Sequence, residues 1–350
     1  MTRLSELGES HVLERILSHN RSGSQVVIGP GDDAAVTAVD GNLVSTADML
    51  VENEDFTRAW LDWGRLGIKA AAQNLSDVCV MGARPHGLLV SLAVPNSTEI
   101  EDLEALFAGI VAEAERAGDD LGCEIPIIGG DLSSSGLIVI AITALGTVAD
   151  CAAITRSGAR PGDSIYLAGT IGRAAAGLDL LFAGVDGDAE VDGDADLDES
   201  LTSLITTQLA PQPDYAAVLN MGAASAMVDV SDGLSTDVGQ IASASGVHAR
   251  IDRSSLHELI DELLPAARHL TGAIEGAQSG EGAAQAAAEA EELALAWVLN
   301  GGEDHGFVAS SAQFDTPPVG WRRIGEMRVG SGVSLDGAPV PTSGFSHFGK

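Results

Sequence analysis

Apolar residues recur along the chain with two different periods, and together they predict a mixture of helices and strands. Residues 56–83 carry apolar side chains at helical spacing and predict one long helix. Residues 97–118 predict a second helix, with Ser97 as its N-cap and acidic residues in its first turn. The apolar run 86–94 ends at Pro95, which is typical of a strand. Because helices and strands do not alternate strictly, the pattern favours α+β, a fold of mixed α/β layers.

The predicted elements fall into two regions, and a chain of 350 residues is long enough for two domains. We expect residues 1–150 to form an N-terminal α/β domain and residues 151–350 to form a C-terminal α/β domain. Further strands are predicted in the first region at 25–28, 42–45, 123–131 and 136–148. The second region predicts strand, loop and helix at 155–184, the same order at 226–246, and a strand-rich end.

Two segments of the second region have the composition of insertions. Residues 271–292 are rich in Ala, Gly and Glu, which predicts a solvated loop that leads into a helix. Residues 184–200 are repetitive and acidic, which favours a disordered loop. An EF-hand calcium loop is the alternative there, because its positions 1, 3, 5, 6 and 12 would be Asp188, Glu190, Asp192, Gly193 and Glu199. Glu190 is long for its position, and an acidic repeat matches such a pattern easily.

Charge and composition narrow the classes of function. The formal net charge is −33, and lysine occurs only as Lys69 and Lys350. So acidic a surface repels nucleic acid and anionic membranes, and we expect neither as a partner. A phosphate ligand is expected to arrive with divalent cations. The N-terminal residues lack a signal peptide and no apolar run is long enough to span a membrane, which favours the cytoplasm. The three cysteines form no Cys-x-x-Cys pair, which argues against a zinc site.

Six times an apolar segment leads to carboxylates beside Gly or Ser. The first, "VVIGPGDD" at 26–33, formally fits a dinucleotide fingerprint, but a β-rich segment follows where that motif needs a helix. The other five are "LVSTAD", "AAQNLSD", "IPIIGGD", "AMVDVSD" and "VLNGGED". Each alone is commonly a turn residue or a helix cap. Asp77 of "AAQNLSD" is different, because it stands near the C-terminal end of a predicted helix, where the helix dipole disfavours an anion.

Oxygen ligands without a Cys or His cluster favour Mg²⁺ over zinc or copper. Mg²⁺ commonly binds through few carboxylates together with the phosphates of a substrate. The repeated acidic motifs therefore indicate phosphoryl transfer, in which catalysis consists mostly of positioning and charge neutralisation.

On these motifs the chain resembles the thiamine-monophosphate kinase family, whose superfamily includes aminoimidazole ribonucleotide synthetase, selenophosphate synthetase and a hydrogenase-maturation protein. "GPGDDAAV" is similar to the family's GIGDDAAV, "STADMLVENEDF" to TTDMLVEGVHF, and "NLSDVCVMGARP" to NLSDIAAMGA-P. "IIGGDLSSS" is similar to GGDTTRS, "VDVSDGLSTDVGQIASASG" to IDxSDGLxxDLxHIxxxSG, and "LNGGEDHGF" to LxGGEDYEL. The resemblance covers almost the whole chain, with the motifs in the family's order.

The resemblance implies ATP-dependent phosphorylation of thiamine phosphate to thiamine diphosphate, by direct in-line transfer through a Mg²⁺ cluster. It implies the two-domain fold of aminoimidazole ribonucleotide synthetase, and a homodimer whose sheet comes from the N-terminal half. By position, the Mg²⁺ contacts would be Asp33, Thr46, Ala47, Asp48, Asp77, Asp131, Asp229 and Asp232. Of these, Asp229 and Asp232 would be catalytic, with the ion at Asp232 near the acceptor. ATP would contact Gly130, Asp131, Arg156 and Ser231. The thiamine moiety would contact Asp55, Glu303 and Phe345.

The chain departs from the family pattern mostly toward the acceptor. Ala47 stands where the family usually has Thr, Asp55 where His is common, and His305-Gly306 where the family has Tyr-Glu. "QLAPQPDY" lacks the basic residues of the usual H-L-x-P-x-P-R. These departures keep open an enzyme of the same superfamily with another acceptor. A non-catalytic acidic cation-binding protein would explain the charge, but not why Gly and Ser so regularly adjoin the acids.

Overall fold

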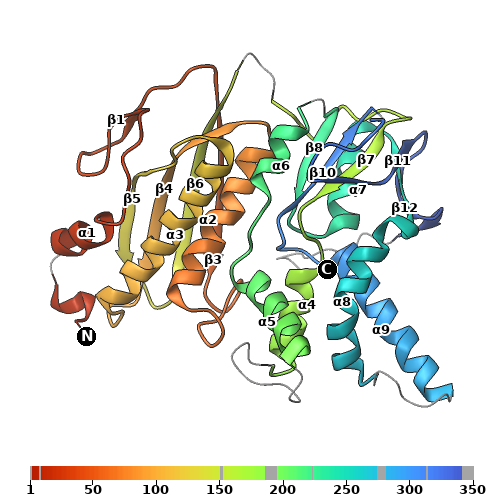
Figure 1. Ribbon diagram of the computed structural model, residues 1–350. Coiled ribbons are helices and arrows are strands. Elements are labelled where there is room, and N and C mark those ends of the chain that lie inside the picture. The colour runs from red at the N-terminus through yellow and green to blue at the C-terminus, as the bar shows by residue number, and fades with distance from the viewer. Residues whose placement is uncertain are drawn as a thin grey trace. The chain divides into compact units, whose positions relative to one another are not determined.

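The computed structural model describes residues 2–7, 9–149, 153–185, 195–222, 224–273, 281–312 and 314–340. The chain divides into two units, Met1–Ala153 and Ile154–Lys350, each with helices packed on its own sheet (Figure 1). Each unit is described by itself. The division lies three residues from the expected boundary at 150.

Unit 1 contains a four-stranded sheet, a small β-hairpin and three α-helices within its described residues. Its elements are a 3₁₀ turn Leu4–Glu6, α1 Glu9–Leu17, β1 Val26–Ile28, β2 Val36–Thr37, β3 Asn42–Val51, α2 Trp63–Val80, β4 Arg84–Val94, α3 Ile100–Leu121, β5 Ile127–Ser134 and β6 Val139–Val148. The sheet order is β3-β6-β4-β5, with β5 parallel to β4 and the other pairs antiparallel.

One face of this sheet is covered by α2 and α3, which lie side by side in Figure 1. Along β6 every second residue is buried, as expected for a strand with one covered face. The opposite face of β3 is far more open. Leu43 and Met49 point to it and expose 56% and 54% of their surface. Unit 1 is therefore a two-layer structure with a partly apolar open face.

The predicted helices and strands of unit 1 are confirmed, but their ends differ. The helix predicted over 56–83 is shorter, Trp63–Val80, and the strand predicted over 123–131 is shifted to Ile127–Ser134. β3 does not end at Ser45 but continues to Val51, because ten residues pair without interruption with β6. Thr46 and Asp48 are therefore strand residues and do not follow the strand. Ser97 was wrong as an N-cap, because α3 begins at Ile100 with Glu99 as its cap residue, and Glu99 makes no side-chain capping bond.

Unit 2 contains a seven-stranded sheet of order β13-β12-β9-β11-β7-β10-β8. Its elements are β7 Ser164–Ala168, α4 Arg173–Phe182, α5 Ala195–Leu209, α6 Tyr215–Asn220, β8 Ala226–Val230, α7 Leu234–Ser245, β9 His248–Ile251, a 3₁₀ turn Arg253–Leu256, α8 His257–Thr271, α9 Glu281–Asn300, β10 Gly306–Ser311, β11 Trp321–Arg328, β12 Gly332–Leu335 and β13 Ala338–Pro339. Helices α8 and α9 pack against each other, as Figure 1 shows.

The strands β7, β8 and β10 are buried along their whole length, which explains why their sequences are mostly apolar. Asp229 is the exception in β8, an acidic residue within a buried strand. Of the two predicted insertions, residues 186–194 and 274–280 lie outside the described residues. Asp188, Glu190, Asp192 and Gly193 of the calcium-loop alternative are among them, whereas Glu199 belongs to α5. None of the described helices is long and apolar enough to cross a membrane.

Candidate functional site

In unit 1, three of the predicted metal residues meet where β3 lies against α2. Thr46 Oγ1 donates a hydrogen bond to Asp77 Oδ2 at 2.7 Å. The backbone N–H of Asp48 donates to Asn74 Oδ1 at 2.9 Å. Because Asn74 and Asp77 are three residues apart, they share one face of α2. The alternation of β3 places Thr46 and Asp48 on the side that faces this helix.

The predicted ATP residues Gly130 and Asp131 lie at the other edge of the same sheet. Pairing in register runs from Asp48 through Ile142 and Val90 to Gly130, which is three strand spacings, or about 14 Å. Two ligands of one Mg²⁺ ion lie within about 4 Å of each other, so Asp48 and Asp131 of one chain do not share an ion directly. Asp131 is exposed and accepts a bond from Ser133 Oγ at 3.2 Å.

Gly130 is required by packing as well as by any contact with ATP. Its φ is +153°, and a Cβ atom there would lie 1.8 Å from the carbonyl oxygen of Val90. Any other residue would force β5 away from β4. The glycine of "GGD" therefore keeps the strand that carries Asp131 in the sheet.

The remaining predicted residues of unit 1 lie in turns or on the open face. Asp33 is exposed in the loop of the β1–β2 hairpin, where its N–H donates to Asp32 Oδ1 at 2.8 Å. Asp55 Oδ2 accepts the N–H of Val51 at 2.7 Å, which closes the turn after β3. Ala47 points to the open face of the sheet, away from Asp77.

In unit 2, Ser231 and Asp232 lie in the β8–α7 loop, Glu303 lies in the α9–β10 loop, and Asp229 lies near the end of β8. Strands β8 and β10 pair directly, with Gly306 opposite Val230, so the two loops lie next to each other. Asp229 and His305 are both buried, and His305 Nδ1 lies 3.3 Å from Asp229 Oδ2. The histidine that departs from the family pattern thus provides a hydrogen-bond partner for a predicted metal residue.

The two loops are joined along their backbones. The N–H of Glu303 donates to the carbonyl oxygen of Ser231 at 3.1 Å. Gly302 makes this approach feasible, because a Cβ atom there would lie 2.0 Å from that same oxygen. The side chain of Glu303 accepts a bond from Gln208 Nε2 at 2.7 Å. Gln208 begins the "QLAPQPDY" segment, and it fixes the carboxylate that was predicted to meet the acceptor.

Asp237 is a buried carboxylate next to these loops. It accepts the N–H of Asp232 at 3.0 Å and a bond from Gln240 Nε2 at 2.9 Å. Burial raises its pKa to about 7, and repulsion by Asp229 and Asp232 acts in the same direction. The N–H of Asp232 and the positive charge of Arg156 oppose that rise in pKa. Arg156, Asp229 and Asp232 are therefore close enough to Asp237 to interact electrostatically.

Asp304, unlike Asp237, caps the N-terminus of helix α4. Its two carboxylate oxygens accept the N–H groups of Arg173 and Ala174 at 3.2 and 3.1 Å. Burial raises its pKa to about 6, although these hydrogen bonds favour the ionised form. The guanidinium of Arg173 pairs with Glu262 of α8. Arg173 is therefore already engaged, and Arg156 is the exposed arginine of the predicted ATP set.

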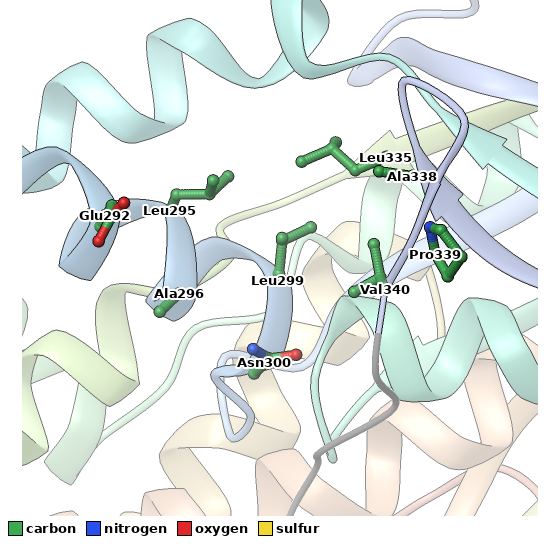
Figure 2. A pocket seen from close by; sticks show the side chains of 9 residues that line it. All are labelled: Glu292, Leu295, Ala296, Leu299, Asn300, Leu335, Ala338, Pro339 and Val340. Atoms are coloured by element: carbon green, nitrogen blue, oxygen red, sulfur yellow. The ribbon is translucent and has the colours of Figure 1, made fainter.

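An apolar groove of unit 2 differs from these acidic loops in the side chains that line it. It has a volume of about 310 Å³ and lies between α9 and the β12–β13 turn, with Leu295, Leu299, Leu335 and Val340 pointing into it (Figure 2). Only Glu292 and Asn300 add polar atoms to its lining. This groove does not suit a triphosphate.

Comparisons with known proteins cover the chain almost completely. Residues 31–148 match the family model of the AIR synthase related protein N-terminal domain, and residues 160–305 match that of its C-terminal domain. A thiamine-monophosphate kinase of Mycobacterium tuberculosis is 37% identical over 99% of this chain and 93% of its own. The chain belongs to the thiamine-monophosphate kinase family.

Solved structures agree with this family. The thiamine-monophosphate kinase of Stenotrophomonas maltophilia K279a has a TM-score of 0.70 at 30% identity, covering 95% of this chain and 96% of its own. AaThiL complexed with AMPPCP and TMP has a TM-score of 0.71 at 29% identity, covering 99% of both chains. The expected two-domain fold of this superfamily is thereby confirmed.

Within this thiamine-monophosphate kinase family member, the structure adds three residues that the sequence analysis did not single out. Asn74, Gln208 and Asp237 each hold a predicted site residue through a hydrogen bond. Asn74 could have been found from its spacing to Asp77 on the helix. Gln208 and Asp237 depend on the fold. Phe345, the third predicted thiamine contact, lies outside the described residues.

The buried carboxyl of Asp304 predicts a pH dependence of stability. Its folded-state pKa of about 6 lies above the ordinary Asp value of 3.8, so the folded state binds the proton more tightly. This contribution, about 3 kcal/mol in full, is complete only below about pH 3 and is lost as the pH rises through 6. In Asp304→Asn, the free energy of unfolding should therefore fall about 2 kcal/mol less between pH 4 and 7 than in the wild type.

Urea unfolding at several pH values measures this difference. Asp261→Asn, a change at an exposed acid of α8, is the control and should follow the wild type. If the free energy of unfolding changed with pH in Asp304→Asn as it does in the wild type, the raised pKa would not belong to this carboxyl.

Proposed function

We propose that this protein transfers the γ-phosphoryl group of ATP to thiamine phosphate and so forms thiamine diphosphate. The observation that carries the proposal is full-length similarity to thiamine-monophosphate kinases, one neighbour of which was solved with AMPPCP and TMP. The acids at the β3–α2 contact and in the β8–α7 loop supply oxygen ligands of the kind that such a reaction uses. In keeping with the sequence, we place the enzyme in the cytoplasm.

The oxygen donors of the site fit Mg²⁺. Among the described residues, no three His, Cys, Asp or Glu side chains form a ready metal-binding group. Mg²⁺ typically uses one or two carboxylates together with substrate phosphates and waters, so it does not need such a group. We propose Asp33, Thr46, Ala47, Asp48, Asp77, Asp131, Asp229 and Asp232 as contacts of several Mg²⁺ ions, with Ala47 contributing only its backbone oxygen. Bound Mg²⁺ would neutralise the phosphate charges that develop during transfer.

The negative charge of the acceptor phosphate has to be neutralised, whereas its attacking oxygen does not need a general base. A phosphate monoester has a second pKa near 6, so its oxygen is already nucleophilic at pH 7. In the proposed in-line step, this oxygen forms a bond to the γ-phosphorus while the bond to the bridging oxygen of ADP breaks. Two like unit charges about 4 Å apart repel by about 4 kcal/mol at an effective dielectric of 20. With Arg173 paired to Glu262, few basic side chains oppose this repulsion.

We propose that unit 1 contributes most of the ATP contacts and unit 2 most of the acceptor contacts. Residues 1–150 would bind ATP with Mg²⁺ through their acidic loops, with Gly130 and Asp131 as ATP contacts. Residues 151–350 would bind the acceptor, with Glu303 facing the cationic thiamine ring system and Phe345 as a second contact. Asp55 of unit 1 would add a third contact to the thiamine moiety. Arg156 and Ser231 would contact ATP. Gln208 donates a hydrogen bond that orients the carboxylate of Glu303. The negative charge of this carboxylate favours a cationic ring system at that end of the acceptor.

The direct test of this function is turnover of ATP with thiamine phosphate and a small panel of other acceptors, with and without Mg²⁺. We expect thiamine diphosphate and ADP in equal amounts, and no product without Mg²⁺. Turnover of another acceptor alone would support a different enzyme of the superfamily. ATP-independent cation binding without turnover would support the non-catalytic alternative.

In the same assay, Asp77→Asn should lower kcat by at least about 100-fold. Its fold should survive, because the amide oxygen of Asn can still accept the bond from Thr46. The loss of an anion near the C-terminal end of α2 should even stabilise the metal-free protein by about 0.3–1 kcal/mol. A melting temperature that falls in step with activity would instead make Asp77 a structural residue.

We also propose that the enzyme is a homodimer formed through the open face of the unit 1 sheet. The evidence for it is the exposed apolar side chains of Leu43 and Met49 on β3, beside the half-buried outer face of β6. Monomeric proteins seldom leave a contiguous apolar sheet face in water. Two copies of the same face would form a closed, self-complementary pair.

The dimer proposal predicts that Met49→Asp gives a monomer, because a buried unpaired charge opposes association. Sedimentation velocity at micromolar concentration measures this outcome. Val329→Asp, a charge placed at an exposed apolar residue of unit 2, is the control and should leave the dimer intact. A wild-type monomer, or a dimer that survives Met49→Asp, would contradict the proposal.

A further inference from the structure

Asp237 stands in the first turn of α7 and reaches back beyond the start of its helix. α7 begins at Leu234, and its cap residue Gly233 makes no side-chain capping bond. The carboxylate of Asp237 instead accepts the N–H of Asp232, one residue before the cap, at 3.0 Å. Asp237 is 1% exposed and Asp232 is half-buried, so water has limited access to this bond.

The orientation of this carboxylate is itself fixed. Gln240, one turn later on α7, donates its Nε2 hydrogen to Asp237 Oδ1 at 2.9 Å, while Oδ2 receives the bond from Asp232. Each oxygen therefore has a defined partner. A rigid helix thus carries the acceptor that holds the backbone of Asp232.

The loop is also held from its opposite side. The carbonyl oxygen of Ser231 accepts the N–H of Glu303, and Ser235 Oγ donates to Asn300 Oδ1 at 2.7 Å. These contacts fix Ser231, directly before Asp232, and Ser235, three residues after it. The N–H of Asp232 itself depends on Asp237.

We propose that Asp237 is a positioning residue of the kinase reaction, which holds the backbone at Asp232 so that the Asp232 carboxylate is directed to the acceptor side. This inference rests on the proposed function. A purely structural role, the anchoring of α7, is the competing explanation. The two differ in what a variant loses: misplacement lowers kcat, whereas a lost anchor lowers only stability.

Three variants separate these explanations. Asp237→Ala removes the acceptor, whereas Asp237→Asn keeps one oxygen for the N–H of Asp232 and should restore most of the position. Asp179→Ala is the matched control, because Asp179 accepts a bond from Trp297 Nε1 at 2.7 Å in the same unit but does not belong to the loop. The measurements are kcat, KM for ATP, melting temperature, and hydrogen exchange of the Asp232 amide in the substrate-free protein.

Asp237→Ala should lower kcat by about 100-fold, the size expected for a small misplacement of a reacting group, with KM for ATP changed less than about three-fold. Exchange of the Asp232 amide should become at least about ten-fold faster in this variant. Asp237→Asn should stay within about five-fold of the wild type both in kcat and in the exchange rate of the Asp232 amide. Asp179→Ala should lose melting temperature but keep kcat.

An unchanged kcat in Asp237→Ala, or an equal loss in Asp179→Ala, would overturn the inference. If Asp237→Ala does not fold, Gln240→Ala takes its place: it should lower kcat about five-fold and speed exchange at Asp232, and an unchanged kcat would again overturn it. A wild type without thiamine phosphate turnover would overturn the proposed function instead, while the exchange measurement would still report whether Asp237 holds Asp232.

Discussion

Carboxylates that are buried without lysine partners have to be held by N–H groups, and the site of unit 2 depends on this constraint. Lysine occurs only at positions 69 and 350, so this unit has none among its described residues. Asp304 accepts hydrogen bonds from the N–H groups at the start of α4, and Asp237 accepts one from the N–H of Asp232. Asp229 lies within hydrogen-bond distance of His305. A buried carboxylate without such donors would lower the free energy of unfolding by several kcal/mol.

The same hydrogen bonds give the loops their shape. When Asp237 accepts the N–H of Asp232, the bond both stabilises a buried charge and fixes the backbone beside a proposed metal contact. In unit 1, Thr46 and Asn74 join β3 to α2 in the same way and bring Asp77 to the strand. Preorganised groups of this kind are what phosphoryl transfer requires, because its catalysis consists mostly of positioning and charge neutralisation.

The sequence predicted the fold better than it predicted the roles of single residues. Helical and strand periods placed α2, β4 and β6, because their buried faces set the spacing of apolar residues. The end of β3 was missed, since Thr46 and Asp48 look like loop residues until pairing with β6 makes them strand. Gln208 and Asp237 were missed because their partners, Glu303 and Asp232, are identified only by tertiary contacts.

In the proposed division, Asp131 of unit 1 serves ATP, whereas Asp232 serves the acceptor. Calorimetric titration with an ATP analogue in Mg²⁺ tests this division directly on Asp131→Asn and Asp232→Asn. We expect at least about ten-fold weaker binding in Asp131→Asn, because this variant removes a charge that would hold the Mg²⁺ of ATP. Binding in Asp232→Asn should stay within about three-fold of the wild type although turnover is lost. An equal loss of affinity in both variants would contradict this division.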